Sequence, residues 1–341
     1  MQTVTPHTYN TMTSKKDFWK LLAQKGPIVA LAPMDGYTDS PYRQIVKKIA
    51  PETVVFSEFY SADGLMHSKE LQKKALTHDP NEYPLIIQIF GKDPHAFAEA
   101  AKIIEGYGIT GIDVNMGCPA KKVVKSGHGS SLMIERETAF HIIEAMSHAV
   151  QIPISVKTRL WWEDASLLTE FCLWLENAGA NLITVHGRTY KQAFSGNADF
   201  TAIYELKKHL HIPILANGDI ESYDDGITKI FSWDDRLLDG FMIGRASFGN
   251  PWCFLPWPYI PTLWEVLDTM EMHGKLLFEW KGKKGILEAR KHLVQYIHGL
   301  VNAKDYRSAL VRVESFEDIR TVLECIRSDH SHILHTPQGK T

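Results

Sequence analysis

Cys118 is the residue whose type and place most directly suggest chemistry. It lies in the string NMGCP, at the end of a short apolar run, where the flanking glycine and proline predict a sharp turn. A thiol in such a place can act as a nucleophile or donate a proton. We therefore expect Cys118 to be functional, whereas Cys172 and Cys325 lie in helix-like patterns and are expected to be core or surface residues.

Lys157 ends another apolar run, ISVKT. A lysine that points into a protein interior must find an anion or a carbonyl group, because an unpaired buried charge is costly. Three readings are open at this point. Lys157 could form an ion pair with Glu58 or Asp113, form a Schiff base with a carbonyl substrate, or bind a cofactor as a cation.

Three further polar residues lie at or near the ends of apolar runs. His186 and Arg188, in the string HGRT, form either a structural pair or contacts to a cofactor or substrate. Gln88 lies inside the run IIQIF and needs a hydrogen-bond partner, which the rim of a flat heteroaromatic cofactor would offer. The scattered acids lack the spacing of a calcium loop, so we predict no metal site.

Eight short runs rich in Val and Ile recur over residues 28–247, separated by stretches with helical periodicity. Such runs are typical of parallel strands buried on both faces. Eight alternating units over about 220 residues predict a (β/α)8 TIM barrel. An open doubly wound sheet is the alternative, disfavoured because no GxGxxG string follows the first run. The runs are IVALAPM (28–34), TVVFSEF (53–59), PLIIQIF (84–90), GIDVNMG (111–117), PISVKTR (153–159), LITVHGR (182–188), PILANGD (213–219) and GFMIGRA (240–246).

The seventh and eighth runs end in glycine motifs, Asn217-Gly218-Asp219 and Gly244-Arg245. In a barrel all carboxyl strand ends meet at one face, and the loops after strands seven and eight often bind phosphate through backbone N–H groups. Glycine lets the backbone approach a ligand closely, and arginine adds a charged fork for phosphate. We therefore predict a phosphate site at these two motifs.

The strand–helix alternation stops after about residue 254, where LPWPYIPTLW (255–264) carries three prolines. Beyond it the pattern is typical of helices alone. We divide the chain into a loosely held N-terminal extension (1–20), a barrel (21–254), a small all-helical domain (255–330) and a frayed tail (331–341). The string KGKKGILEARKH (281–292) gathers positive charge that either is solvated or binds nucleic acid; its candidate residues are Lys281, Lys283, Lys284, Arg290 and Lys291.

Composition excludes several classes of protein. With 37 basic and 40 acidic residues the net charge is −3, which argues against a protein held to nucleic acid by bulk charge. The four cysteines form no CxxC pair, so neither a disulfide framework nor a zinc site is expected. The first 25 residues lack the apolar core of a signal peptide, and the sequence holds no run of 18 apolar residues. We expect a cytoplasmic protein without membrane contact.

The strings taken together resemble the tRNA-dihydrouridine synthases, in order and with family-like spacing from about Ile28 to about Gly299. The forms NMGCPAKKV, ANGDI and ARKH look most like the B-type bacterial branch. The matching strings are APMDGYTDSPYR (32–43), QIFG (88–91), DVNMGCPAKKV (113–123), VKTRLWW (156–162), HGRTYKQAFSGNADF (186–200), ANGDI (216–220), MIGRASFGNPW (242–252) and ARKHLVQYIHG (289–299).

This resemblance implies a flavin enzyme that acts on tRNA as a monomer, without a protein partner. FMN, reduced by NADPH, would pass a hydride to C6 of a uracil ring, and Cys118 would protonate C5. By resemblance Asn115 orients the uracil or the flavin ring, Arg159 and Arg188 contact substrate or cofactor, and the basic residues of 281–292 grip the tRNA backbone. The residues implied to bind FMN are Pro33, Met34, Asp35, Gln88, Lys157 and His186 along the ring and ribityl chain, and Asn217, Gly218, Asp219, Gly244 and Arg245 at the phosphate.

Three rival functions stay open. The first is an FMN-dependent reductase of a free pyrimidine or another small molecule, which would not need the helical domain. The second is a non-catalytic tRNA-binding protein, whose expected mark is the loss of Cys118 or Lys157, yet both are present. The third is an aldolase-like barrel with Lys157 as Schiff base, which does not explain Cys118 together with two glycine motifs.

Overall fold

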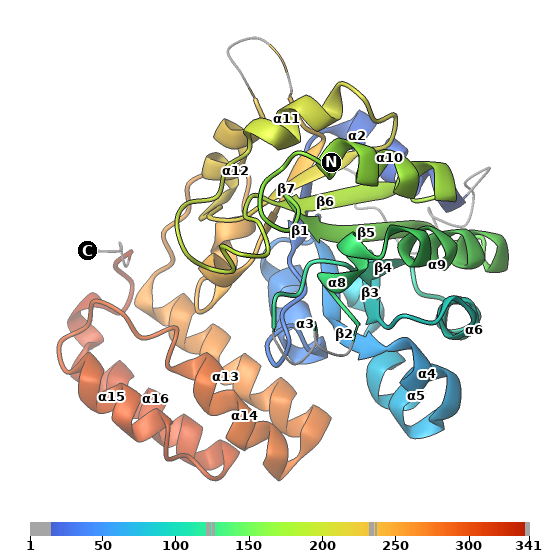
Figure 1. Ribbon diagram of the computed structural model, residues 1–341. Helices are drawn as coiled ribbons and strands as arrows, with labels where there is room; N and C mark the ends of the chain where they lie inside the picture. The colour runs from blue at the N-terminus through green and yellow to red at the C-terminus, as the bar shows by residue number, and fades with distance from the viewer. Residues whose placement is uncertain (1–14, 121–123, 125–126, 232–234, 236, 338–341) are drawn as a thin grey trace.

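The computed structural model describes residues 15–120, 124, 127–231, 235 and 237–337. Eight parallel strands close into a barrel in sequence order, each paired with the strand before and after it (Figure 1). The predicted TIM barrel and its eight strands are confirmed. The strands are β1 (Ile28–Leu31), β2 (Val54–Ser61), β3 (Leu85–Phe90), β4 (Gly111–Asn115), β5 (Ile154–Arg159), β6 (Leu182–His186), β7 (Ile214–Asn217) and β8 (Gly240–Ile243).

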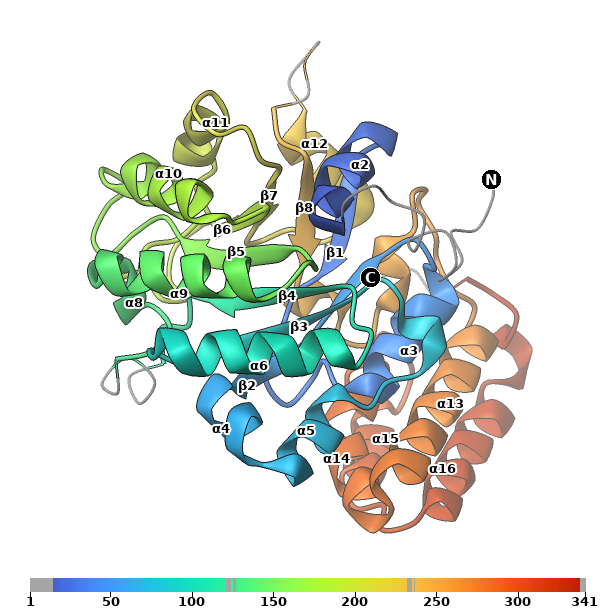
Figure 2. The same ribbon diagram turned by 90° about the vertical axis from the view of Figure 1, so that its right-hand side faces the viewer.

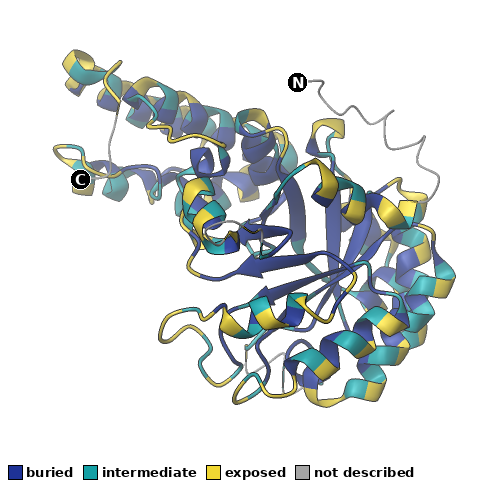
Figure 3. Ribbon diagram, turned by 90° about the horizontal axis from the view of Figure 1, so that it is seen from above, coloured by how far each residue is buried: buried dark blue, intermediate teal, exposed yellow. Residues whose placement is uncertain are grey.

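Helices surround the barrel and bury one face each, most of them toward the strands (Figures 2 and 3). Their buried residues are mostly Ala, Ile, Leu and Phe at helical spacing, which is why these segments fold as amphipathic helices. They are α3 (Ser40–Ile49), α4 (Ala62–His67), α5 (Lys69–Leu76), α6 (Pro94–Gly106), α8 (Ser131–Ile134), α9 (Arg136–Ala149), α10 (Leu168–Ala178), α11 (Thr201–Lys207) and α12 (Tyr223–Ile230). Of these, α5 lies outside the ring against α4 (Figure 2).

The amino end of the barrel is closed by α2 (Phe18–Lys25). Phe18 and Trp19 are almost fully buried and pack with strand residues that point into the barrel, among them Phe56 and Met242. The prediction of a loose extension over 1–20 is therefore wrong for residues 15–20, because two aromatic side chains bury their surface there. The rest of that segment, 1–14, lies outside the described residues.

Strand β2 carries a bulge at its carboxyl end. Phe56 pairs with Ile86 and Phe59 with Gln88, so β2 has one residue more than β3 over this stretch. A bulge bends a strand and redirects its side chains. Here Phe59 lines the cavity described below, while Glu58 accepts a hydrogen bond from the loop that follows β1.

Four helices form a separate core after the barrel: α13 (Leu263–Lys281), α14 (Lys283–Leu293), α15 (Ala303–Leu310) and α16 (Phe316–Asp329). Helix α13 packs against α3, which fixes the helical region on the side of β1 (Figure 1). The predicted frayed tail is wrong for residues 331–337: Leu334 accepts the N–H of Trp264, and Pro337 bridges to Thr262. Residues 338–341 lie outside the described part. No helix in the described ranges is long and apolar enough to span a bilayer.

Replacing Trp19 with alanine tests the role of α2. Because Trp19 is 1% exposed, Trp19→Ala should lower the free energy of unfolding by about 3–5 kcal/mol, as expected for a large buried side chain. Trp257, which is 55% exposed, provides the matched control, and Trp257→Ala should change little. Urea unfolding followed by tryptophan fluorescence and circular dichroism measures both. Equal effects of the two substitutions would contradict the assigned packing.

Candidate active site

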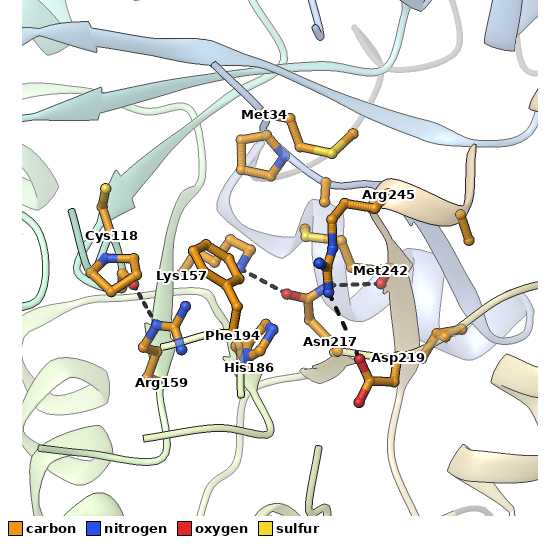
Figure 4. A pocket seen from close by; sticks show the side chains of 18 of the residues that line it. Met34, Cys118, Lys157, Arg159, His186, Phe194, Asn217, Asp219, Met242 and Arg245 are labelled. Carbon is orange, nitrogen blue, oxygen red and sulfur yellow. Dashed lines mark hydrogen bonds and ion pairs between the residues drawn. The ribbon is translucent and has the colours of Figure 1, made fainter. Parts of the chain in front are cut away.

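A cavity of about 760 Å³ opens at the carboxyl ends of the barrel strands. Figure 4 shows Cys118 on one side, Asp219 and Arg245 on the other, and Lys157 and His186 between them. The volume suits a ligand of cofactor size. The residues predicted from the sequence that line it are Pro33, Met34, Gln88, Asn115, Cys118, Lys157, Arg159, His186, Asn217, Gly218, Asp219, Gly244 and Arg245.

Asn115, the last residue of β4, shapes the turn that carries Cys118. Its side-chain oxygen accepts the backbone N–H groups of Gly117 at 3.2 Å and Cys118 at 3.0 Å. Its side-chain nitrogen donates to the Gln88 oxygen at 2.9 Å. The amide thus has one N–H left for a ligand, and its oxygen serves the turn. The Cys118 thiol itself is partly exposed and faces the cavity.

Gln88 joins this turn to a carboxylate inside the barrel. Its nitrogen donates to Asp113 Oδ2 at 2.7 Å, and the Ser155 hydroxyl donates to Asp113 Oδ1 at 2.6 Å. Burial raises the pKa of Asp113 to about 6, and the hydrogen bonds from Ser155 and Gln88 oppose that shift. At neutral pH Asp113 is therefore mostly an acceptor. Gln88, for which the sequence predicts a hydrogen-bond partner, has a protein partner at each end of its amide: Asp113 at the nitrogen and Asn115 at the oxygen.

The Lys157 ammonium donates to Asn217 Oδ1 at 2.9 Å. Burial and the neighbouring charge of Arg159 lower its pKa, against the opposite effect of Asp113, to about 8. Neither Asp113 nor Glu58 forms a salt bridge with Lys157 among the described residues. The ion pair considered from the sequence is therefore not made, and the charge faces the cavity with one neutral partner.

His186, the last residue of β6, is a neutral imidazole. Burial, together with the positive charges of Lys157, Arg159, Arg188 and Arg245, lowers its pKa to about 2. Its Nδ1 is buried and has no hydrogen-bond partner in the part of the chain described. Because buried polar atoms are normally paired, this atom indicates a partner in a bound ligand.

Unpaired backbone N–H groups gather after β7 and β8. Those of Gly218, Gly244 and Arg245 donate to no acceptor within the described ranges. Gly218 has φ +113°, and a Cβ there would lie 2.9 Å from Ala198 Cβ, so only glycine fits. Free N–H groups that line one wall of a cavity can form a cradle for an anion. The phosphate site at the two glycine motifs stays a prediction, for which these donors are available.

Asp219 lies beside this cradle with its charge compensated. Burial raises its pKa, but hydrogen bonds from Arg188 (2.6 Å) and from the Ala198 N–H (2.8 Å) outweigh that effect and lower it. Arg245 is 4.0 Å away, and its side chain is 64% exposed at the cavity mouth. The carboxylate therefore orients two arginines, of which Arg245 has the side chain that is open at the cavity.

Arg159 and Arg188 use their hydrogen-bond donors mainly on the protein itself. Arg159 donates to the carbonyls of Gly117 at 2.7 Å and Ala193 at 2.8 Å, which ties the Cys118 turn to the loop after β6. Arg188 donates to the Gly196 carbonyl in the same loop, and it does not line the cavity. Its Nη1 is buried and has no hydrogen-bond partner among the described residues, so the predicted ligand contact of Arg188 stays a prediction. Asp35 is exposed on the loop after β1 and also lies off the cavity wall.

Some basic residues of the string 281–292 bind other parts of the protein, and others lie on the surface. Lys281 pairs with Asp39 at 2.7 Å and Glu288 at 2.5 Å, and is 19% exposed. Arg290 donates from two nitrogens to the Val313 carbonyl. These two side chains hold the fold, contrary to the expected phosphate contact. The residues that remain on the surface or partly exposed are Lys283, Lys284 and Lys291.

Several residues that line the cavity were not predicted from the sequence. Phe59 is turned inward by the bulge in β2, which no residue pattern announces. Met242 looks like any apolar strand residue. Phe194 is 63% exposed, and the guanidinium carbons of Arg159 and Arg245 lie 5.7 and 5.6 Å from its ring centre. An aromatic residue in a polar loop is the one signal that was available for it.

Comparisons with known proteins agree with this geometry. A family model described as dihydrouridine synthase matches residues 30–331. The chain is 33% identical over 339 residues to a probable tRNA-dihydrouridine synthase 1 of Synechocystis, covering 95% of this chain and 94% of that protein. It is 34% identical over 302 residues to tRNA-dihydrouridine synthase B of Xanthomonas campestris, covering 85% and 90%.

Among solved structures, a complex of 2-naphthoyl-CoA reductase with 2-naphthoyl-CoA matches with a TM-score of 0.52 and 13% identity. The match covers 67% of this chain and 49% of that one. At this identity the likeness shows the barrel fold alone.

Replacing Lys157 with methionine tests the cost of its buried charge. The pKa of about 8 in the folded chain lies below the ordinary 10.5, so the folded state disfavours the ammonium and the unfolded state holds more protons between those values. At pH 7 Lys157→Met should therefore be more stable than the wild type by about 1–3 kcal/mol, allowing for partial exposure. The gain should shrink as pH rises from 8 toward 10.5.

Urea titrations over this pH range measure the difference between variant and wild type. Lys20→Met, on an exposed position of α2, controls for the substitution type. If the Lys157→Met protein were less stable than the wild type at pH 7, burial of the Lys157 charge would not cost stability as expected.

Proposed function

The chain belongs to the dihydrouridine synthase family, and on this premise we propose that it reduces the C5=C6 bond of uridines in tRNA. The resemblance read from the sequence strings is confirmed. The observation that carries the proposal is one cavity that joins the Cys118 thiol, the Lys157 ammonium and a cradle of free N–H groups. The deciding experiment is to incubate transcribed tRNA with the protein, FMN and NADPH and to map dihydrouridine.

The residues present fit FMN, which supports it as the cofactor. The cavity has room for it, His186 Nδ1 lacks a partner among the described residues, and the free N–H groups of Gly218 and Gly244 suit a phosphate. Gln88 and Lys157 would hold the ring side, and Arg245 the phosphate side. When bound, FMN supplies the hydride that is added at C6, after its own reduction by NADPH.

Cys118 would complete the reduction by giving its proton to C5, where hydride addition leaves negative charge. The ammonium of Lys157 and the guanidinium of Arg159 line the same cavity as the sulfur that is left behind. A proton from solvent then restores the thiol. Asn115 holds the backbone of this turn and so sets the direction of the thiol.

A uracil inside folded tRNA reaches such a cavity only when it is flipped out of its stack. Lys283, Lys284 and Lys291 offer positive charge on α14 for the RNA backbone, a contact that reads shape and phosphate. We place the protein with its tRNA substrate in the cytoplasm, as a monomer. Turnover of free uracil or dihydroorotate with none on tRNA would instead favour the small-molecule reductase.

Cys118→Ala separates the proton donor from the flavin chemistry. The variant should bind FMN and accept electrons from NADPH like the wild type, because the thiol is not part of the proposed FMN-binding set. Dihydrouridine formation should fall by about 100- to 10,000-fold, the usual contribution of a general acid. Anaerobic flavin bleaching and single-turnover modification of tRNA measure the two steps. Cys325→Ala, at an exposed position of α16, is the control. A Cys118→Ala variant that forms dihydrouridine as fast as the wild type would show that Cys118 is not the proton donor.

Lys283 and Lys284 changed together to alanine test the tRNA surface. Each lost phosphate contact should reduce the slope of log affinity against log salt by about 1, and affinity should fall for all tRNAs alike. Filter binding at several salt concentrations measures this. Lys20, exposed on α2, and Lys208, exposed directly after α11, form the control pair; both helices lie at the opposite end of the molecule (Figure 1). An unchanged slope in the Lys283/Lys284 variant would show that these lysines are only solvated.

A further inference from the structure

One wall of the cavity is the loop between β1 and α3, which contributes Pro33 and Met34. This loop is held by polar contacts rather than by strand pairing. The Thr38 hydroxyl accepts the Met34 N–H at 3.0 Å and donates to the Met34 carbonyl at 3.2 Å. The N–H of Gly36 donates to Glu58 Oε1 at 2.6 Å. The shape of this wall therefore depends on a small number of charged and polar partners.

The loop ends at Asp39, whose two oxygens have different tasks. Oδ1 accepts the N–H of Tyr42 and so caps α3, while Oδ2 accepts the Lys281 ammonium at 2.7 Å. Lys281 is the last residue of α13, 242 residues further along the chain, and Glu288 of α14 holds it from the other side. The Asp39 side chain is 6% exposed and that of Lys281 is 19% exposed. The helical region thus reaches the cavity wall through a nearly buried ion pair.

The charge of the Asp39–Lys281 pair affects the whole β1–α3 loop. Three carboxylates lie at this loop: Asp35 and Asp39 belong to it, and Glu58 of β2 accepts the N–H of Gly36. Burial raises the pKa of Glu58, as do the neighbouring charges of Asp39 and Asp35, while the Gly36 hydrogen bond and Lys281 lower it. Lys281 is therefore a cation that offsets the repulsion between these acids, and it is paired directly with Asp39. Without it Glu58 and Asp39 would repel, and the hold on Gly36 would weaken.

The same helices also touch the loop after β8, at the phosphate side. Gly249 lies so close to the Gln295 carbonyl, just beyond α14, that a Cβ there would be 2.0 Å from its oxygen. The rings of Tyr37 and Phe248 stack at 4.1 Å and link the β1 and β8 loops, and the Lys291 ammonium lies 4.9 Å from the Tyr37 ring centre. Two loops of the cavity are therefore braced from the helical side.

We propose that Lys281 is a positioning residue for the cofactor: through Asp39 it makes α13 part of the support of the β1–α3 loop. Flavin affinity then depends on a residue of the helical region. This inference rests on the proposed FMN-dependent function. It also replaces the phosphate contact expected of Lys281 from the sequence, because both of its near neighbours are carboxylates and little of its surface is open to RNA.

The test compares Lys281→Met with Lys284→Met. Lys284 has the same residue type, faces the same Glu288 at 3.8 Å, and is 71% exposed. Lys281→Met should raise the Kd for FMN about tenfold, in the usual range of coupling between sites, and leave tRNA affinity at saturating FMN nearly unchanged. Lys284→Met should leave the Kd for FMN unchanged and weaken the binding of tRNA. Flavin fluorescence quenching and filter binding give the two constants.

A double-mutant cycle keeps the test independent of folding. Asp39→Asn retains an oxygen to cap α3 but removes the charge that Lys281 meets. If the pair acts as a unit, Lys281→Met should weaken FMN binding in the wild type and add little in the Asp39→Asn protein. Circular dichroism melting of each apo-protein separates a loss of fold from a loss of loop position.

The outcomes distinguish this inference from the proposed function. A wild type that binds FMN and a Lys281→Met variant with the same Kd would overturn the inference alone. So would a loss of tRNA affinity in Lys281→Met with FMN affinity kept, which would restore the phosphate contact. A folded wild type that binds no FMN would overturn the proposed function and this inference with it.

Discussion

The Lys157 ammonium, held inside a closed barrel, is the constraint around which the cavity is arranged. Water cannot fully solvate it there, and its one hydrogen bond among the described residues goes to the neutral oxygen of Asn217. The carboxylate of Asp113 is committed to Ser155 and Gln88. A buried charge left in this state lowers stability, so it is kept where a ligand supplies the missing partner. Nδ1 of His186, which also lines the cavity, lacks a hydrogen-bond partner in the described part of the chain, so it fits the same proposed ligand.

A second constraint is the direction of the hydrogen bonds that end at Cys118. The backbone N–H of Cys118 can only donate, so the oxygen of Asn115 must face it, and the nitrogen of Asn115 must face Gln88. From the other end, the Asp113 carboxylate can only accept, so the nitrogen of Gln88 must face Asp113. The two ends require the same orientation of both amides. The cavity wall on this side is therefore preorganised before any ligand arrives, which is what accurate placement of a thiol needs.

The sequence was sufficient where a residue's place follows from its own strand. Eight short apolar runs separated by helical stretches predicted the eight strands, and the residues at the strand ends placed Cys118, Lys157 and the two glycine motifs at one face of the barrel, where they line the cavity. It was insufficient where a role depends on a partner far along the chain. Lys281 looks like a surface lysine in a basic string until α13 lies against α3 and Asp39 becomes its neighbour. The packing of Trp19 at the amino end of the barrel was not predicted for the same reason, because its partners lie on distant strands and the local sequence of α2 does not show them.

The junction between barrel and helices explains how a chain of net charge −3 can act on RNA. His273 and His292 lie buried at this junction, stacked against Tyr42 of α3, and burial lowers the pKa of both, so they pack as neutral aromatic rings. Such an interface buries aromatic surface between α3 and the helices α13 and α14. On the proposed function, a few lysines of α14 would then suffice to place a tRNA, because the shape of the RNA supplies the remaining selectivity. Bulk positive charge is then unnecessary, and the acids that brace the cavity loops can remain.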